Sequence, residues 1–315
     1  MENAGYDPFV RGRFPVGVRT IQALDKARGR LFPCEIWYPE AAQPETWPLI
    51  LFSHHSGGHR RAATFLTTHL CSHGYVVAAL DHSEVVAPEL ARKDGETAEQ
   101  RAARADAWIA SRVPDIHFLL NYLLESEAHL DPARIGLVGH SFGGWTVLEA
   151  TAAEPRGGAV VALAPGGASN PRPGILQLKL TFAWGRDVPT LYLVAENDTP
   201  LPLSGMYELF ERTPATKQMV VLRRADHLHF IDNVEQEHEK VRAILLTAEL
   251  AKMAEEMRPI AELCSGEQAH LFVRGLTLCH MDAVLKGHQE AQRFLSGDIQ
   301  GELAARGVDA FLHQP

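Results

Sequence analysis

Short runs of apolar residues recur along the chain, and most are followed by polar or turn-forming residues. The runs are residues 48–52, 75–80, 135–138, 160–164, 191–195 and 219–222. Stretches with helical periodicity, such as 62–73 and 116–124, lie between them. Short apolar strands that alternate with helices are typical of a mostly parallel sheet with helices on both faces. The pattern therefore predicts an α/β fold.

The two ends of the chain depart from this pattern. Residues 16–24 and 31–38 are β-rich runs around a charged turn at 25–29, which predicts an antiparallel pair ahead of the main sheet. From Asn233 onward the pattern is almost wholly helical, and we expect long helices at 235–257 and 276–295.

The middle of the chain contains one polar, alanine-rich stretch, residues 89–112, which we expect to be a surface excursion near the mouth of the site. No linker composition divides the chain, so we expect a single domain over residues 1–315. Within it, residues 233–268 are interpreted as a helical insertion that forms a cap, a dimer contact or both.

Composition and charge narrow the classes of partner. Hydrophobic residues make up 46% and charged residues 22%, an ordinary globular mixture. A formal net charge of -9 argues against nucleic acid and anionic membranes as partners. No apolar run approaches the ~20 residues of a membrane-spanning helix, and the first residues lack the basic and apolar stretches of a secretory signal.

The four cysteines are far apart and form no CxxC pair, which favours reduced thiols. We therefore expect a cytoplasmic protein that acts on a small-molecule ester. A homodimer formed through the helical last third is one interpretation of that region.

A glycine-flanked serine follows the run 135–138 and precedes a helical stretch, in the order Gly139-His140-Ser141-Phe142-Gly143. A serine at a sharp turn between strand and helix has its hydroxyl raised clear of the sheet, and only small neighbours tolerate that geometry. The plain alternative is that Ser141 only caps the helix, but a cap does not need both glycines. The turn therefore predicts Ser141 as a nucleophile.

A serine nucleophile needs a histidine to take its proton and a carboxylate to orient that histidine. In this fold class the chain order is serine, acid, histidine. Asp198 follows the run 191–195 in a loop and is favoured over Glu196, which lies at the end of the run. His227 follows the run 219–222 and is favoured over His229. Asp226 is interpreted as a local stabiliser of that loop.

The loop 52–58 follows the first apolar run, where a second oxyanion donor belongs. We predict the backbone N–H groups of Ser56 and Phe142 as the two donors, with His55 shaping the loop between them. Trp145 is a candidate wall of the substrate pocket, although core packing is the more common role of a single tryptophan.

Histidines gather around the same loop, which raises the question of a metal. His55 and His59 are four apart, but Gly57 and Gly58 interrupt the helix that such a pair would need. His54 is interpreted as hydrogen-bonding within the loop, and His82 as lying near the pocket. The sequence therefore predicts no metal and no cofactor.

With these residues together, the chain resembles the dienelactone-hydrolase-like branch of the α/β-hydrolases, which includes platelet-activating-factor-type acetylhydrolases and polyester-cleaving esterases. The resemblance covers about residues 14–232 and resumes near Leu276. Its motifs are Trp37-Tyr38-Pro39, Phe52-Ser53-His54, Gly74-Tyr75-Val76-Val77, Asp81-His82, Arg112-Val113-Pro114-Asp115-Ile116, Gly139-His140-Ser141-Phe142-Gly143-Gly144 and Ala225-Asp226-His227.

The resemblance implies an α/β-hydrolase fold and a nucleophile, acid and base at Ser141, Asp198 and His227. The chain departs from the family at His55, where a glycine is usual, and in the segment 233–268. Dienelactone hydrolase itself uses a cysteine, so Ser141 points to ordinary esters.

The function predicted is therefore a serine hydrolase that cleaves carboxylic esters through an acyl-enzyme. The same three residues would also serve a C–C, thioester or amide hydrolase or an acyltransferase. A non-catalytic ligand-binding protein on this scaffold is the third alternative, although such proteins often lack one of the three residues.

Overall fold

A computed structural model describes residues 5–41, 46–246 and 251–314 of the chain. Its strands are β1 (Val16–Asp25), β2 (Arg30–Pro39), β3 (Trp47–Ser53), β4 (Val76–Leu80), β5 (Leu130–His140), β6 (Gly157–Leu163), β7 (Thr190–Ala195), β8 (Lys217–Leu222) and β9 (Ala310–Leu312). Its α-helices are α1 (Thr64–Ser72), α2 (Ser83–Val86), α3 (Ala98–Ser126), α4 (Phe142–Ala153), α5 (Leu203–Arg212), α6 (Val234–Leu246), α7 (Ala251–Glu256), α8 (Gly266–Leu285), α9 (Gln289–Ser296) and α10 (Ile299–Ala304). Short 3₁₀ helices are η1 (Pro88–Leu90), η2 (His227–Phe230) and η3 (Ile260–Glu262).

The strands form one nine-stranded sheet in the order β1-β2-β4-β3-β5-β6-β7-β8-β9. The six strands from β4 to β8 in this order are parallel to one another. At one edge of the sheet β1 and β2 form an antiparallel pair, and this pair is attached to the sheet through β2, which is antiparallel to β4. The α/β fold and the antiparallel start are therefore confirmed.

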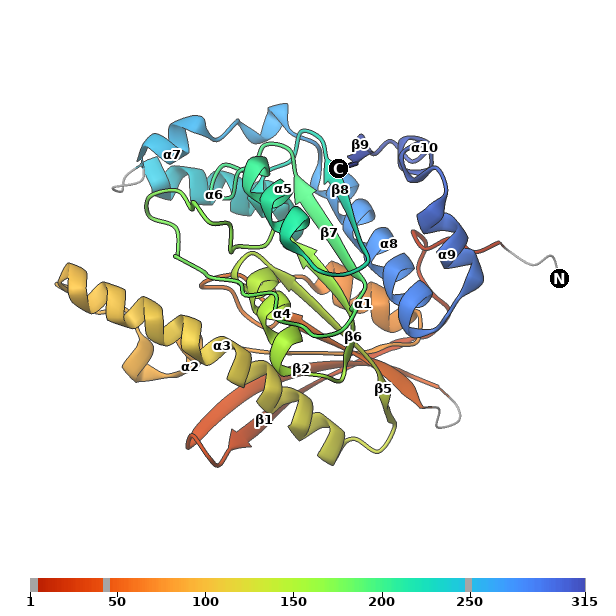
Figure 1. Cartoon of the computed structure of the whole chain (residues 1–315), viewed down its shortest axis with the longest axis horizontal. Helices are drawn as coiled ribbons and strands as arrows, with labels where there is room; N and C mark the ends of the chain where they lie inside the picture. Colours follow the sequence, from red (N-terminus) through yellow and green to blue (C-terminus); the bar gives the residue numbers. More distant parts are fainter. Residues whose placement is uncertain (1–4, 42–45, 247–250, 315) are drawn as a thin grey trace.

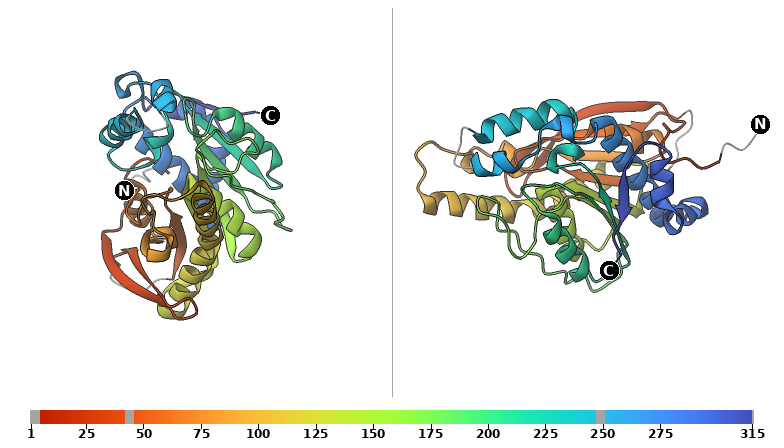
Figure 2. Two further views of the ribbon diagram at one scale, coloured as in Figure 1. Left: turned by 90° about the vertical axis from the view of Figure 1, so that its left-hand side faces the viewer. Right: turned by 90° about the horizontal axis from the view of Figure 1, so that it is seen from above.

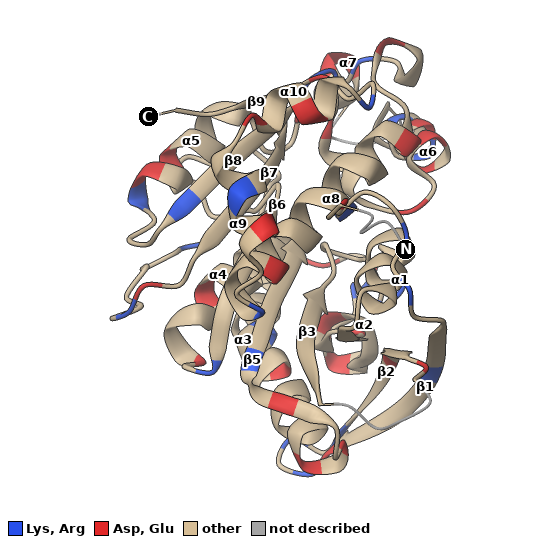
Figure 3. Cartoon of the chain, turned by 90° about the vertical axis from the view of Figure 1, so that its right-hand side faces the viewer, with Lys and Arg blue, Asp and Glu red and all other residues tan. Residues whose placement is uncertain are grey.

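Helices cover both faces of the sheet (Figures 1 and 2). Along β3, Leu49 and Leu51 join the apolar core under α3, α4 and α5, while Ile50 and Phe52 join the core under α1, α8 and α10. This alternation explains why the strand is continuously apolar, because both of its faces are buried. Figure 3 shows charged residues on helices and turns, whereas β3, β4, β6 and β7 consist only of uncharged residues.

Helix α3 runs continuously through two stretches that the pattern separated. The polar residues 98–112 and the apolar stretch 116–124 lie in one helix of 29 residues, with Pro114 inside it. A capping box between Thr97 and Gln100 satisfies the first turn. The alanine-rich first half is a good helix former, so the expected excursion is instead the exposed arm of a core helix (Figure 1).

The prediction of one long helix at 235–257 is wrong. The His238 side chain in α6 donates through Nε2 to the Arg258 carbonyl at 2.9 Å, whereas a straight helix would hold these residues about 30 Å apart. The segment instead folds into α6, α7 and η3, and residues 247–250 lie outside the described residues.

Two further differences concern the last third of the chain. The helix expected at 276–295 is divided into α8 and α9, and between them Gly287 has a φ of 62° that favours glycine. The chain then adds β9 antiparallel to β8, a strand of three residues that is too short to show a periodicity. Within the described ranges, no helix has both the length and the apolar character needed to cross a bilayer.

Candidate active site

Ser141 lies at the turn between β5 and α4 in strained backbone geometry, with φ 58° and ψ -114°. Hydrogen bonds hold the turn on both sides. The Ser141 N–H donates to the Leu163 carbonyl at 2.9 Å, and the Ser141 carbonyl accepts from the backbone of Trp145 and Gly166 at 3.0 Å each. A left-handed serine costs about 1–3 kcal/mol, so these contacts must stabilise it.

The two flanking glycines are required by space. A Cβ on Gly139 would lie 2.1 Å from the Gly143 carbonyl oxygen, and a Cβ on Gly143 would lie 2.0 Å from the Ser53 carbonyl oxygen. The start of α4 can therefore approach the end of β3 only without side chains. This contact places the turn directly beside the loop that follows β3.

The structure brings Ser141, His227 and Asp198 together from three separate loops. His227 Nε2 lies 2.8 Å from Ser141 Oγ, and His227 Nδ1 lies 2.7 Å from Asp198 Oδ2. Each residue follows the carboxyl end of a parallel strand, namely β5, β7 and β8, where ligands bind in such sheets. The side chain of His227 is 13% exposed and that of Asp198 only 1%, so the imidazole faces the open side.

The rival residues have other partners. Glu196 accepts from Arg223 Nη1 at 3.1 Å and from the Arg224 backbone at 3.0 Å, so its carboxylate is directed along the surface. His229 is fully buried and bonded through Nε2 to the Cys264 carbonyl at 3.1 Å. The geometry therefore selects the pair Asp198 and His227.

Charge and burial act in opposite directions on this pair. Burial opposes a charged imidazole, but the charge and hydrogen bond of Asp198 outweigh it and raise the pKa of His227 above its ordinary value. Burial raises the pKa of Asp198, and the contact with His227 opposes that rise. The Leu201 N–H donates to Asp198 Oδ1 at 2.7 Å and fixes the carboxylate. The imidazole is thereby oriented with its Nε2 toward Ser141 Oγ.

His140, the residue before the serine, also contacts the base. It is fully buried, and its Nε2 lies 3.0 Å from the His227 carbonyl oxygen. Burial lowers the pKa of His140 well below its ordinary value, so it is a neutral donor to that carbonyl. The sequence named His140 only as a member of the turn, because nothing local shows a contact 87 residues away.

A buried cluster ties the segment 233–268 to the loop of the base. His238 Nδ1 in α6 lies 2.6 Å from Asp226 Oδ2, and Asp226 is the residue before His227. Burial opposes both charges, yet hydrogen bonds from His229 and then His238 lower the pKa of Asp226, and the contact with Asp226 raises the pKa of His238. Asp226 also caps η2 by accepting from the Leu228 N–H at 2.9 Å, as expected for a local stabiliser.

The loop after β3 is a tight turn in which the Gly58 N–H donates to the His55 carbonyl at 3.0 Å. Ser56 and Gly57 are exposed at its tip. The His55 ring lies 5.4 Å from that of His140. Burial and the nearby His227 lower the pKa of His55 to about 3, so His55 is neutral and does not compete as a base.

Phe142 is the first residue of α4, and its N–H therefore has no partner within the helix. The Trp145 side chain is 4% exposed and packs on Phe142, with ring centroids 5.6 Å apart. Its indole N–H donates to the Lys179 carbonyl at 2.8 Å. Trp145 thus anchors the chain after β6 from within the core.

The remaining histidines of the group are occupied by hydrogen bonds. His82 lies between Ser53 Oγ, 2.8 Å from Nε2, and Asp115 Oδ2, 3.1 Å from Nδ1. This repeats the order serine, histidine, acid, but all three are fully buried and Ser53 lies in a regular strand. Among the residues that the structure describes, no group of three or more histidine, cysteine or acidic side chains is placed to hold a metal.

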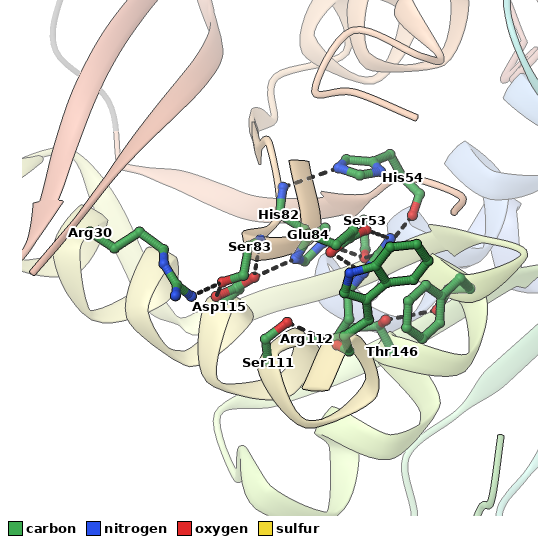
Figure 4. A network of polar contacts seen from close by, with 12 residues as sticks. Arg30, Ser53, His54, His82, Ser83, Glu84, Ser111, Arg112, Asp115 and Thr146 are labelled. Atoms are coloured by element: carbon green, nitrogen blue, oxygen red, sulfur yellow. Dashed lines mark hydrogen bonds and ion pairs between the residues drawn. The ribbon is translucent and has the colours of Figure 1, made fainter. Parts of the chain in front are cut away.

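The contacts that Arg112 makes beside the site could not be predicted from the sequence. Its side chain is fully buried in α3 and contacts the loop after β3, Glu84 and Phe142 (Figure 4). The signal available was an arginine two residues before Pro114, in a helix where Ile109, Val113 and Ile116 are apolar. Spacing alone could not show its partners, which lie between 28 and 59 residues away.

The sheet order and the strained turn at Ser141 are those of the α/β-hydrolase fold, and the comparison with solved structures agrees. A ferulic acid esterase from Streptomyces cinnamoneus superposes with a TM-score of 0.63 over 90% of this chain and 94% of its own, at 22% sequence identity. A model of the family described as platelet-activating factor acetylhydrolase, isoform II, matches residues 27–113. The chain thus has the α/β-hydrolase fold.

Among individual relatives, platelet-activating factor acetylhydrolase of Cavia porcellus is 24% identical over 238 residues, which are 62% of this chain and 51% of that protein. Cutinase est1 of Thermobifida alba is 26% identical over 207 residues, which are 63% of this chain and 58% of the cutinase. The chain therefore spans little more than half the length of these relatives.

Proposed function

We propose that this protein is a serine hydrolase that cleaves carboxylic esters through an acyl-enzyme. The observation that carries the proposal is the continuous line of hydrogen bonds from Ser141 Oγ through His227 to Asp198, at 2.8 and 2.7 Å. The names of its relatives, which include acetylhydrolases, a cutinase and a ferulic acid esterase, support an ester as the bond that is cleaved.

In the proposed reaction His227 Nε2 takes the proton of Ser141 as its Oγ attacks the ester carbonyl. The tetrahedral intermediate collapses when His227 gives that proton to the leaving alcohol, and the acyl group stays on Ser141. Water then attacks the acyl-enzyme with His227 again as base and releases the acid. Asp198 holds the imidazole in the required tautomer and stabilises its charged form.

The negative oxygen of the intermediate needs preorganised donors. We assign them to the backbone N–H of Phe142 and to a backbone N–H of residues 54–58, called the oxyanion loop below. Ser56 is the residue of that loop favoured from the sequence. The Phe142 N–H supports its assignment because it lies at the positive end of α4, directly after Ser141.

Contacts of the segment 233–268 support its role as a cap over the proposed site. Arg172 in the loop after β6 donates to the Thr199 carbonyl at 2.8 Å and pairs with Glu256 of α7 at 2.5 Å. Thr199 follows Asp198, so Arg172 links α7 to one loop of the proposed site. A cavity of about 470 Å³ between residues 167–176 and 200–208 adjoins these loops, and we assign it to one substituent of the ester.

A panel of p-nitrophenyl esters of increasing acyl length tests the proposed function. We expect release of p-nitrophenol from at least one member, with the preferred length reporting the depth of the cavity. A thioester and an anilide of the preferred acyl group separate the alternative bonds. Absence of turnover with every ester by folded protein would contradict the esterase assignment.

The pH dependence follows from the direction of the His227 shift. A protonated His227 cannot accept the serine proton, so kcat/KM is low in acid and rises as pH passes the pKa of His227. Because Asp198 raises that pKa above 6.5, the midpoint is expected above pH 6.5. A profile that is flat between about pH 5 and 8 would exclude His227 as the base.

A further inference from the structure

The Arg112 side chain uses every one of its five N–H donors inside the protein. Nη1 donates to the His54 carbonyl at 2.7 Å and to Ser53 Oγ at 3.4 Å. Nη2 donates to the His55 carbonyl at 3.3 Å and to Glu84, while Nε donates to the second Glu84 oxygen at 3.2 Å. Figure 4 shows Arg112 within this network of polar contacts, and the residue itself is fully buried.

The two carbonyls bonded by Arg112 belong to consecutive peptide groups of the oxyanion loop. A trans peptide is planar, and its N–H points opposite to its C=O. Fixing the His54 carbonyl therefore fixes the direction of the His55 N–H, and fixing the His55 carbonyl fixes that of the Ser56 N–H. Both N–H groups are directed away from the guanidinium.

His54 adds a second restraint on the same loop. Its Nε2 accepts from the His82 backbone N–H at 3.1 Å, so the ring proton is on Nδ1 and is donated to the His55 carbonyl at 2.7 Å. Burial and the nearby Arg112 charge lower the pKa of His54 well below its ordinary value, which keeps this tautomer neutral. The His55 carbonyl thus accepts from His54, from Arg112 and from the Gly58 backbone.

The guanidinium also contacts the other proposed donor residue. Its central carbon lies 4.1 Å from the centre of the Phe142 ring, a cation–π distance. Phe142 provides the N–H at the start of α4. One buried side chain therefore touches both halves of the proposed oxyanion hole, and it does not contact Asp198 or His227.

We propose that Arg112 is the positioning residue of the oxyanion hole, which sets the peptide planes of residues 54–56 and holds them in register with Phe142. This inference rests on the proposed function. A buried charge is costly unless it is fully paired, and here Glu84, two carbonyls and an aromatic face provide that pairing. Lysine, with three donors at one point, cannot reach all of these partners.

The test compares the kinetics of wild type, Arg112→Lys and the double variant Arg112→Met with Glu84→Gln, in which no buried carboxylate is left unpaired. The matched control is Arg186→Met. Arg186 also donates to backbone carbonyls, those of Gly157 at 2.7 Å and Glu154 at 2.9 Å, but at the far end of α4.

We expect the double variant to lower kcat about 100-fold, the loss typical of one oxyanion donor, with KM changed less than about threefold. The kcat of Arg112→Lys should lie between that of the double variant and that of wild type. The midpoint of the pH profile should stay at its wild-type value, because Arg112 does not touch the base. The Ki of a trifluoromethyl ketone, whose adduct carries an oxyanion, should rise in proportion to the loss in kcat/KM.

Three results would overturn the inference. They are a kcat within about threefold of the Arg186→Met control, a rise in KM alone, or a loss of kcat that comes with a shifted pH midpoint. If circular dichroism shows that the double variant does not fold, the kinetics of Arg112→Lys decide the test. A kcat of Arg112→Lys equal to that of wild type would then overturn the inference. Folded wild type that cleaves no ester would instead overturn the proposed function and this inference with it.

Discussion

Replacing Ser141 with alanine is expected to abolish both ester hydrolysis and reaction with a fluorophosphonate probe. In a serine hydrolase, removal of the nucleophile alone lowers kcat by about 10⁶-fold, since no other side chain can take over the attack. Labelling of wild type and Ser141→Ala, read by intact mass, measures this directly. The protein should remain folded, because alanine lacks only the oxygen that faces His227.

Ser126 in α3 provides the control for this experiment. Its hydroxyl donates only to the Tyr122 carbonyl within the same helix, so Ser126→Ala should react like wild type. Undiminished labelling of Ser141→Ala, or no labelling of folded wild type, would remove Ser141 from the mechanism.

Replacing Asp198 with asparagine is expected to lower kcat about 10⁴-fold, as it does where a buried aspartate orients a catalytic histidine. The amide would stabilise the wrong tautomer of His227 and could not balance its positive charge. Without the Asp198 carboxylate, burial would be opposed only by the weaker effect of the Asp226 charge, so the remaining activity should have its midpoint at lower pH than wild type.

Glu196 offers a control two residues away. Its carboxylate pairs with Arg223 at the surface, so Glu196→Gln should change kcat little. Steady-state kinetics across pH for both variants separates the two carboxylates. A larger loss in Glu196→Gln than in Asp198→Asn would reassign the acid.

The sequence was sufficient for the parts of this protein that are determined locally. A strand is recognised by its apolar run, and the turn at Ser141 by glycines that the close approach to Ser53 requires. Asp198 and His227 could be chosen because each follows a strand in the expected order. Parallel strands bring their carboxyl ends to one edge, so chain order alone placed these residues together.

The sequence was not sufficient where a contact joins distant elements. The fold of residues 235–257 depends on His238 reaching the Arg258 carbonyl and the Asp226 carboxylate, and helical periodicity carries no sign of either contact. Arg112 looked like one position of a polar helix, since its partners in β3 and α2 are not adjacent to it in the chain. β9 is so short that its composition does not predict a strand, and only its pairing with β8 identifies it as one.

The contact between His238 and Asp226 also has a consequence for protein engineering. Exchange of residues 233–268 with the corresponding segment of a relative is an obvious route to a new substrate range. Here the exchange would remove His238 and leave the buried Asp226 carboxylate, next to His227, with His229 as its remaining imidazole partner. A chimera that keeps its turnover must therefore transplant Asp226 and His238 as a unit, with the crossover point between the end of β8 and residue 226 and not after η2.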